Sequence, residues 1–197
     1  RQAEEPIPGY QKARQVVFSS IYPMDTGEYP ELSKALEKLA INDAALTFEK
    51  DSSAALGFGF RCGFLGLLHL DVIQERLQRE FDIGLVISAP SVKYKLKLKD
   101  NSEIEVDNPS YWPDPMAIES ASEPYIKASI ITPETYVGGV MELCREHRSE
   151  SQTMNYLSAN RLEVTSIMPL GEVLFEFYGK LKMLTRGYGS FDYVPIE

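Results

Sequence analysis

The chain has few of the residues that build most catalytic and metal centres. Its 197 residues include two cysteines, two histidines and one tryptophan. Cys62 and Cys144 lie far apart, so neither a disulfide framework nor a thiolate metal site is expected, and a reducing compartment fits best. Both cysteines fall within apolar patterns, which is typical of small buried side chains. His69 and His147 belong to no H-E-x-x-H or C-x-x-C arrangement, so we predict no metal site.

Long hydrophobic runs and an excess of positive charge are also missing. No apolar run approaches the roughly 18 residues that a membrane-spanning helix needs, and the polar opening does not resemble a signal peptide. Lysine and arginine number 20 against 29 aspartate and glutamate, which gives a formal net charge of −9. Composition alone therefore argues against a nucleic-acid partner. Because the chain opens on Arg1 instead of methionine, we expect it to be an internal segment of a longer protein.

Motifs that bind a nucleotide or activate a nucleophile are absent from the sequence as well. No G-x-x-x-x-G-K-[ST] loop occurs, and the glycines of Gly57-Phe58-Gly59 lie in a strand pattern without the third glycine of a dinucleotide fingerprint. Cys62 and His69 could form a thiol and its base, but a helix that begins near Phe64 would separate them. We therefore predict no catalytic residue, no metal and no cofactor in this chain.

The first half of the chain has the hydrophobic pattern of a sheet packed on two helices. The pattern predicts strands over 16–21, 46–48, 54–60 and 85–88, and helices over 29–42 and 64–81. The second helix carries a stripe of Leu70, Ile73, Leu77 and Phe81, which Leu65, Leu68 and Val72 would widen. Strand, helix, strand, strand, helix, strand is the order of a ferredoxin-like unit.

A lysine-rich hairpin and a proline-bearing loop follow this first unit. Residues 91–99 alternate strictly between apolar side chains and lysines, and 104–106 supply a partner strand. The loop over 107–123 contains three prolines and is the best candidate for a domain boundary. After it, strands over 125–131, 152–157, 161–168 and 188–194 alternate with helices from Thr132 to Arg148 and over 171–184, which repeats the earlier order.

The predicted fold class is therefore α+β, with two ferredoxin-like (βαββαβ) sandwich domains. We assign residues 1–14 to a linker from an upstream domain and 15–106 to the first ferredoxin-like domain with its extra hairpin. Residues 107–123 form the linker loop, and 124–197 form the second ferredoxin-like domain.

One run of residues is specific enough to indicate a family. Residues 54–71 read A-A-L-G-F-G-F-R-C-G-F-L-G-L-L-H-L-D, and D-V-I-Q-E-R-L-Q-R-E continues the run through 80. This block resembles the LepA (elongation factor 4) family of translational GTPases. The resemblance extends to 6–10, 39–49, 88–92 and Arg186-Gly187-Tyr188, so it covers essentially the whole chain.

The resemblance implies a role that composition does not suggest. LepA proteins are similar to elongation factor G without its fourth domain, and this chain resembles the third and fifth domains of that architecture. GTP, magnesium and GTP hydrolysis then belong to the full-length parent, and the fragment is expected to be inactive alone. Arg61 and Gly63 are expected near the surface that faces the GTPase domain. The implied partners are the ribosome (ribosomal RNA, ribosomal proteins and tRNA) and the upstream GTPase and barrel domains.

The resemblance also implies that the parent remodels tRNA-bound ribosomes, with back-translocation proposed for the family. Bacterial cytoplasm is the expected location, and peripheral association of the parent with the inner membrane is left open. Two alternatives remain: the same domains of another translation factor such as elongation factor G, and a small-ligand-binding regulatory module with ferredoxin-like folds.

The lysines of the hairpin are the candidate RNA contacts. Lys93, Lys95, Lys97 and Lys99 would line one face of a strand at intervals of about 7 Å, close to the spacing of successive phosphates. The other interpretation is that they keep an exposed strand in solution and prevent edge pairing.

Overall fold

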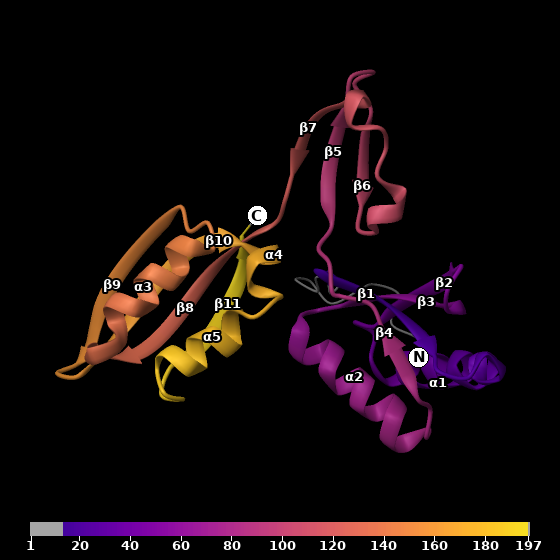
Figure 1. Ribbon diagram of the computed structural model, residues 1–197, viewed down its shortest axis with the longest axis horizontal. Helices are drawn as coiled ribbons and strands as arrows, with labels where there is room; N and C mark the ends of the chain where they lie inside the picture. The colour runs from indigo at the N-terminus through magenta and orange to yellow at the C-terminus, as the bar shows by residue number, and fades with distance from the viewer. Residues whose placement is uncertain (1–13, 197) are drawn as a thin grey trace, which may run out of the picture. The chain divides into compact units, whose positions relative to one another are not determined.

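The computed structural model describes residues 14–196 and divides the chain into two compact units, 1–90 and 91–197 (Figure 1). The linker predicted for 1–14 lies outside the described residues except for Arg14. Each unit contains a four-stranded antiparallel sheet, and the second unit has a further sheet of three strands.

The first unit has the predicted ferredoxin-like order. Its elements are β1 (Val17–Pro23), α1 (Tyr29–Asn42), β2 (Thr47–Ser53), β3 (Gly57–Phe64), α2 (Leu67–Glu80) and β4 (Leu85–Ile87), with a short 3₁₀ turn at Thr26–Glu28. The sheet order is β2-β3-β1-β4. Leu36 on α1 and Ile73 and Leu77 on α2 are almost fully buried with Ile21 and Phe64 of the sheet. Their removal from water supplies the apolar burial that holds this unit together.

The junction between β3 and α2 differs from the prediction. β3 runs to Phe64 and not only to residue 60, so Arg61 and Gly63 lie inside a central strand. α2 begins only at Leu67. The physical reason is strand pairing: Phe64 stays in register with Val17, and its ring is fully buried.

The apolar stripe of α2 is narrower than the prediction. Leu70, Ile73 and Leu77 are buried. The residues expected to widen the stripe are exposed instead: Leu65, Leu68 and Val72. Only the face of α2 that carries these three buried residues packs against the sheet, because a four-stranded sheet contacts only one side of a helix.

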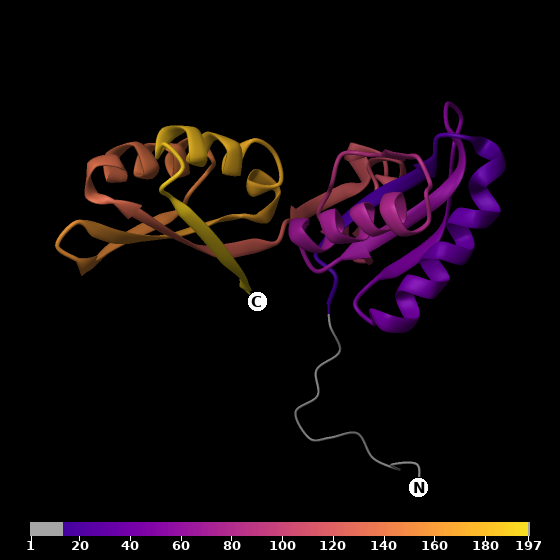
Figure 2. The same cartoon turned by 90° about the horizontal axis from the view of Figure 1, so that it is seen from below.

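The second unit repeats the ferredoxin-like order. Its elements are β8 (Tyr125–Pro133), α3 (Val137–Glu146) after a 3₁₀ turn at Glu134–Tyr136, β9 (Ser151–Ser158), β10 (Arg161–Pro169), α4 (Leu170–Val173), α5 (Phe177–Leu184) and β11 (Ser190–Ile196). The sheet order is β11-β8-β10-β9. Figure 2 shows the helices of this unit on one face of its sheet. The fold class of the chain is thus α+β with two ferredoxin-like halves, as predicted.

The last predicted helix, 171–184, is interrupted. α4 ends at Val173, α5 starts at Phe177, and Glu176 between them has a positive φ of 51°. The bend lets Val173, Leu174 and Phe177 all reach the core. Helical periodicity alone could not show it, because the apolar spacing continues across the break.

The lysine hairpin does not belong to the first compact unit. β5 (Tyr94–Leu98) pairs with β6 (Glu103–Val106), as expected, but also with β7 (Ile118–Ser122) from the region predicted as a linker loop. Two 3₁₀ turns, Pro109–Tyr111 and Pro115–Ala117, connect β6 to β7. The units divide after Pro90. The extra pairing gives Leu96 an apolar neighbour on each side, Ile104 and Ala121.

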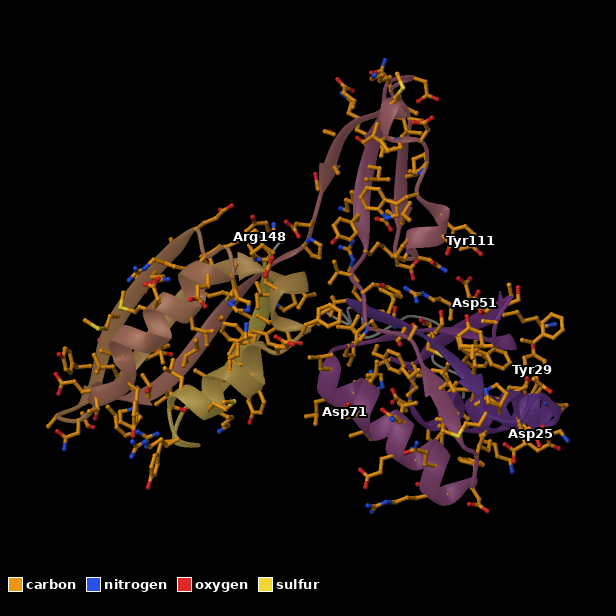
Figure 3. The ribbon with its side chains drawn as sticks, viewed as in Figure 1. Asp25, Tyr29, Asp51, Asp71, Tyr111 and Arg148 are labelled. Atoms are coloured by element: carbon orange, nitrogen blue, oxygen red, sulfur yellow. The ribbon has the colours of Figure 1, made fainter. Side chains whose placement is uncertain are left out.

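An arginine outside the predicted sites connects three segments of the second unit. Arg148 follows α3 with a positive φ of 58°. Its Nη1 donates to Glu123 Oε1 at 2.5 Å and its Nε to Glu172 Oε1 at 2.6 Å. Glu123 lies between β7 and β8, and Glu172 lies in α4. One guanidinium group therefore joins the end of α3, the entry to β8 and α4 (Figure 3).

Candidate functional site

The candidate site is the face of the first sheet that points away from α1 and α2. Side chains alternate between the two faces of a strand, and the register pairs Ile21 with Phe60 on the helix side. Ser20 pairs with Arg61 on the opposite side. β3 carries glycines on either side of Arg61 on this face, Gly59 and Gly63.

A chain of hydrogen bonds fixes Arg61 on this face. Its Nη1 donates to Ser20 Oγ at 3.1 Å, and Ser20 Oγ donates to Asp51 Oδ2 at 2.7 Å. Tyr22 OH donates to the same carboxylate oxygen at 3.1 Å. Arg61 is only 8% exposed. Burial raises the pKa of Tyr22, and the nearby Asp51 carboxylate raises it further. The Tyr22 hydroxyl therefore remains a donor at neutral pH, and Asp51 balances the charge of Arg61.

The glycines that flank Arg61 make room for aromatic rings of β1. A Cβ atom on Gly59 would meet Tyr22 Cδ1 and the Ile21 carbonyl oxygen, both within 2.5 Å of it. A Cβ atom on Gly63 would lie 2.5 Å from Thr47 Oγ1 and 3.0 Å from Phe18 Cε1. Gly63, predicted to face a GTPase domain, is thus a packing position under neighbouring side chains. Ring coverage thus accounts for two of the three glycines of G-F-G-F-R-C-G, Gly59 and Gly63, whereas Gly57 has a positive φ of 79°.

The lysine strand has its positive charge compensated from within its own sheet. Lys93 Nζ lies 3.4 Å from Glu105 Oε2, and Lys97 Nζ lies 2.9 Å from Glu119 Oε2. Lys95 pairs in register with Glu105. A shallow hollow of about 420 Å³ on this face is lined by lysine, glutamate and serine side chains of β5, β6 and β7. The face therefore presents alternating charges, not the bare row of positive charge that the sequence suggested.

Comparison with known proteins gives the family. The family model for elongation factor G, domain III, matches residues 13–89, and the model for the elongation factor G C-terminus matches 120–197. Elongation factor 4 2 of Rhodopirellula baltica is 83% identical over all 197 residues. Elongation factor 4 of Desulfotalea psychrophila is 59% identical over 194 residues and that of Treponema denticola 57% over 192, each over 98% of this chain. The chain belongs to the elongation factor 4 family. It spans about a third of the length of these relatives (33%, 32% and 32%).

The two domain matches of this elongation factor 4 family member follow the compact units only in part. The domain III match ends at 89, next to the division after Pro90. The C-terminal match begins at 120, within β7, so most of the three-stranded sheet lies outside both matches. The sheet built from 94–122 is thus a feature that separates this chain from the two elongation factor G domains.

His69, within the family block, has a structural role that the sequence suggested only in outline. Its Nδ1 accepts a hydrogen bond from the Leu65 N–H at 2.9 Å, so Nε2 carries the proton in the neutral ring. Nε2 then donates to Asp43 Oδ2 at 2.7 Å. Asp43 follows α1 and also accepts from Ala45 N. His69 therefore joins the end of α1 to the turn that precedes α2. Cys62 lies on the face of β3 that is packed against the helices, where it is buried.

Cys62 gives a testable dependence of stability on pH. Burial raises the pKa of this thiol from 9.0 to about 12. The folded state thus keeps a proton that the unfolded state releases above pH 9, so the stabilising contribution is complete below pH 9 and is lost as the pH rises toward 12. We expect the free energy of unfolding to fall between pH 9 and 11 by more in the wild type than in Cys62→Ala. Urea titrations over that range measure the difference, and equal slopes would contradict it.

The structure shows no further chemical centre in the described range. Among residues 14–196 no helix combines the length and hydropathy needed to cross a membrane. Within the same range no three histidine, cysteine, aspartate or glutamate side chains gather as a metal ion would require. Sequence reasoning named Arg61 as a candidate but did not name its hydrogen-bonded neighbours Ser20, Tyr22 and Asp51. The signal was present in β1, where Ser20 and Tyr22 fall on the same side of an alternating strand.

Proposed function

We propose that this chain is the ribosome-docking part of an elongation factor 4 GTPase, and that it couples ribosome contact to a GTPase domain elsewhere in the same protein. The names of its relatives and the two elongation factor G domain matches support this assignment. The observation that carries it is the position of Arg61. This charged residue is held on the helix-free face of the first sheet, within the R-C-G-F-L-G-L-L-H block.

This face of the sheet is suited to transmit a displacement of one strand to the neighbouring strands and to α2. Arg61, Ser20 and Asp51 come from three different strands, so a displacement of one of these strands is transmitted through the hydrogen-bond chain to the other two. β3 leads through Phe64 into α2, and Phe64 is completely buried. Because packed interiors do not deform continuously, a shift of β3 is passed to α2 as a rigid displacement.

In the whole protein we propose that GTP and magnesium bind outside this chain and that binding and release follow GTP hydrolysis. The partners would be ribosomal RNA, ribosomal proteins and tRNA on tRNA-bound ribosomes, with back-translocation or fidelity control as the outcome. Bacterial cytoplasm is the proposed location, since the relatives are bacterial elongation factors. Membrane association has no support in the residues described.

The proposal that GTP binds outside this chain is tested by comparing the 197-residue chain with the full-length factor. Isothermal calorimetry of the 197-residue chain with GTP and magnesium should show no heat of binding, because the sequence has no phosphate-binding loop. The full-length factor should bind GTP and hydrolyse it faster when 70S ribosomes are added. Micromolar affinity of the chain for GTP, or a full-length rate that ribosomes do not change, would refute the proposal.

The lysine strand is proposed as a weaker, secondary RNA contact. Lys93 and Lys97 form ion pairs with glutamates, whereas Lys95 only lies opposite Glu105 in the strand register. We therefore expect Lys95→Gln/Lys99→Gln to reduce ribosome affinity more than Lys93→Gln/Lys97→Gln. The first pair should also reduce the slope of log affinity against log salt by up to about 1.8. Binding releases fewer counterions when two phosphate contacts are lost, and each contact contributes about 0.9 to the slope. Filter binding at several salt concentrations measures both values. Equal slopes for wild type and both variants would leave the strand with only its structural role.

A further inference from the structure

The turn that follows α5 is held in one conformation by a set of hydrogen bonds. Gly187 N donates to Lys182 O at 2.7 Å, and Lys182 Nζ donates to Gly189 O at 2.5 Å. Thr185 Oγ1 donates to Leu181 O at 2.8 Å and accepts from Gly189 N at 2.9 Å. Thr185 is completely buried. A Cβ atom on Gly189 would lie 2.7 Å from Thr185 Oγ1, so the turn admits no larger residue there without rearrangement.

This rigid turn holds two large side chains in solvent. Arg186 is exposed although its backbone has a positive φ of 50°, a conformation that costs a non-glycine residue energy. Tyr188 is 69% exposed. Neither side chain has a hydrogen bond or ion pair with any residue in the described range. A turn fixed by so many bonds therefore positions a cation and an aromatic ring that serve no folding purpose.

The surroundings of the turn are basic, unlike the chain as a whole. The segment 174–191 carries Lys180, Lys182 and Arg186 against Glu176, a net charge of 3 − 1 = +2 within a chain of −9. Lys182 also lies 5.4 Å from the centroid of the Tyr178 ring. Lys180 Nζ lies 3.6 Å from Glu176 Oε2, so Lys182 and Arg186 account for the net positive charge. On the lysine strand, glutamates from β6 and β7 offset Lys93 and Lys97. The turn after α5 is thus a basic surface that also carries exposed aromatic rings.

We propose that this turn binds single-stranded RNA, with Tyr188 stacked on an unpaired base and Arg186 bound to an adjacent phosphate. Exposed aromatic rings beside cations are the usual means of holding unstacked bases and their backbone. Gly187 is exposed and has open space where a Cβ atom would lie, so a sugar-phosphate backbone can approach the turn closely at this residue. The inference rests on the proposed function, because a ribosome supplies the RNA. The local positive charge disfavours a basic protein as the partner. The experiment must therefore distinguish RNA from an acidic protein.

The experiment compares variants of the full-length factor in equilibrium binding to bacterial 70S ribosomes. Tyr188→Ala should weaken binding by at least about fivefold with an unchanged salt slope, because stacking is largely independent of salt. Tyr188→Trp should retain wild-type affinity. Arg186→Asn should weaken binding and reduce the salt slope by roughly 0.7, the value for one phosphate contact on a single strand. Asparagine tolerates a positive φ, so this variant keeps the turn. Arg161→Ala, an exposed arginine on β10 of the same unit, should change neither value.

Each contrary outcome has a distinct meaning. If the wild type does not bind ribosomes, the proposed function fails and this inference fails with it. If the wild type binds and both turn variants match it in affinity and salt slope, the RNA contact alone is refuted. If both variants weaken binding but Arg186→Asn keeps the wild-type slope, the turn contacts a protein, which also overturns the RNA assignment. Circular dichroism and thermal unfolding of each variant confirm that the fold is retained.

Discussion

Adding one methyl group at Gly59 should lower the free energy of unfolding of the first unit by about 3 kcal/mol. The added carbon would meet the Ile21 carbonyl oxygen, and a central strand cannot move away from its neighbour without losing hydrogen bonds. Gly63→Ala should cost less, roughly 1–2 kcal/mol, because its nearest atoms belong to the side chains of Thr47 and Phe18, which can rotate. Urea denaturation of the 197-residue chain measures both.

Gly138→Ala is the matched control for these two changes. Gly138 lies in α3 with no atom within 4 Å of an added Cβ, so alanine should stabilise the chain by about 0.5–1 kcal/mol through its better helix propensity. Because the two units can unfold separately, tryptophan fluorescence, which reports on the second unit through Trp112, and far-UV dichroism should be followed together. A Gly59→Ala protein as stable as the wild type would show that β1 and β3 are less tightly packed than the structure describes.

Replacing Arg61 with methionine should destabilise the first unit by about 3 kcal/mol. Methionine keeps the length of the side chain but removes the positive charge, so among the described residues the Asp51 carboxylate is left with neutral donors: the hydroxyl groups of Ser20 and Tyr22 and the Ser52 N–H. An uncompensated carboxylate beside a buried network is the costly part of this change. Chemical denaturation at pH 7 measures it, and ribosome-stimulated GTP hydrolysis by the full-length factor tests the proposed coupling role.

A double-mutant cycle separates the charge from packing. If Arg61 and Asp51 are coupled through Ser20, then Asp51→Asn should cost much less in the Arg61→Met background than in the wild type. Arg61→Lys should restore part of the stability, since a positive charge returns without the guanidinium geometry. Additive effects of Arg61→Met and Asp51→Asn would mean that the two groups act independently.

The periodic parts of the fold could be predicted from the sequence. The helix at Tyr29–Asn42 was predicted with its observed ends, because its apolar spacing stops before the polar pair Asn42 and Asp43. The strand and helix order of both ferredoxin-like halves also followed from spacing. The third strand at 118–122 was not predicted, since its sequence I-E-S-A-S has little β character and is held by pairing with β5. Pairing between distant segments is a tertiary effect that no local pattern contains.

The candidate site was predicted less completely than the fold. The family block pointed to Arg61, but its partner Asp51 lies in the hairpin strand before it, and only the register brings the two together through Ser20. The lysines could be found from alternation, whereas the glutamates that offset them come from two other strands. In both cases the sequence identifies a charge on one strand, and the folded sheet determines what compensates it.

The two ion pairs of Arg148, with Glu123 and Glu172, affect how the second unit resists mechanical force. Its two carboxylate partners lie 25 and 24 residues away along the chain, so the guanidinium group acts as a cross-brace between segments that the backbone connects only by long detours. A pull applied to the three-stranded sheet reaches the end of α3 and α4 through this brace as well as through β8. The Arg148 side chain is about half exposed, so dissolved ions screen the brace. The unit should therefore be stiffer at low ionic strength than at high, and single-molecule extension at two salt concentrations would measure that difference directly.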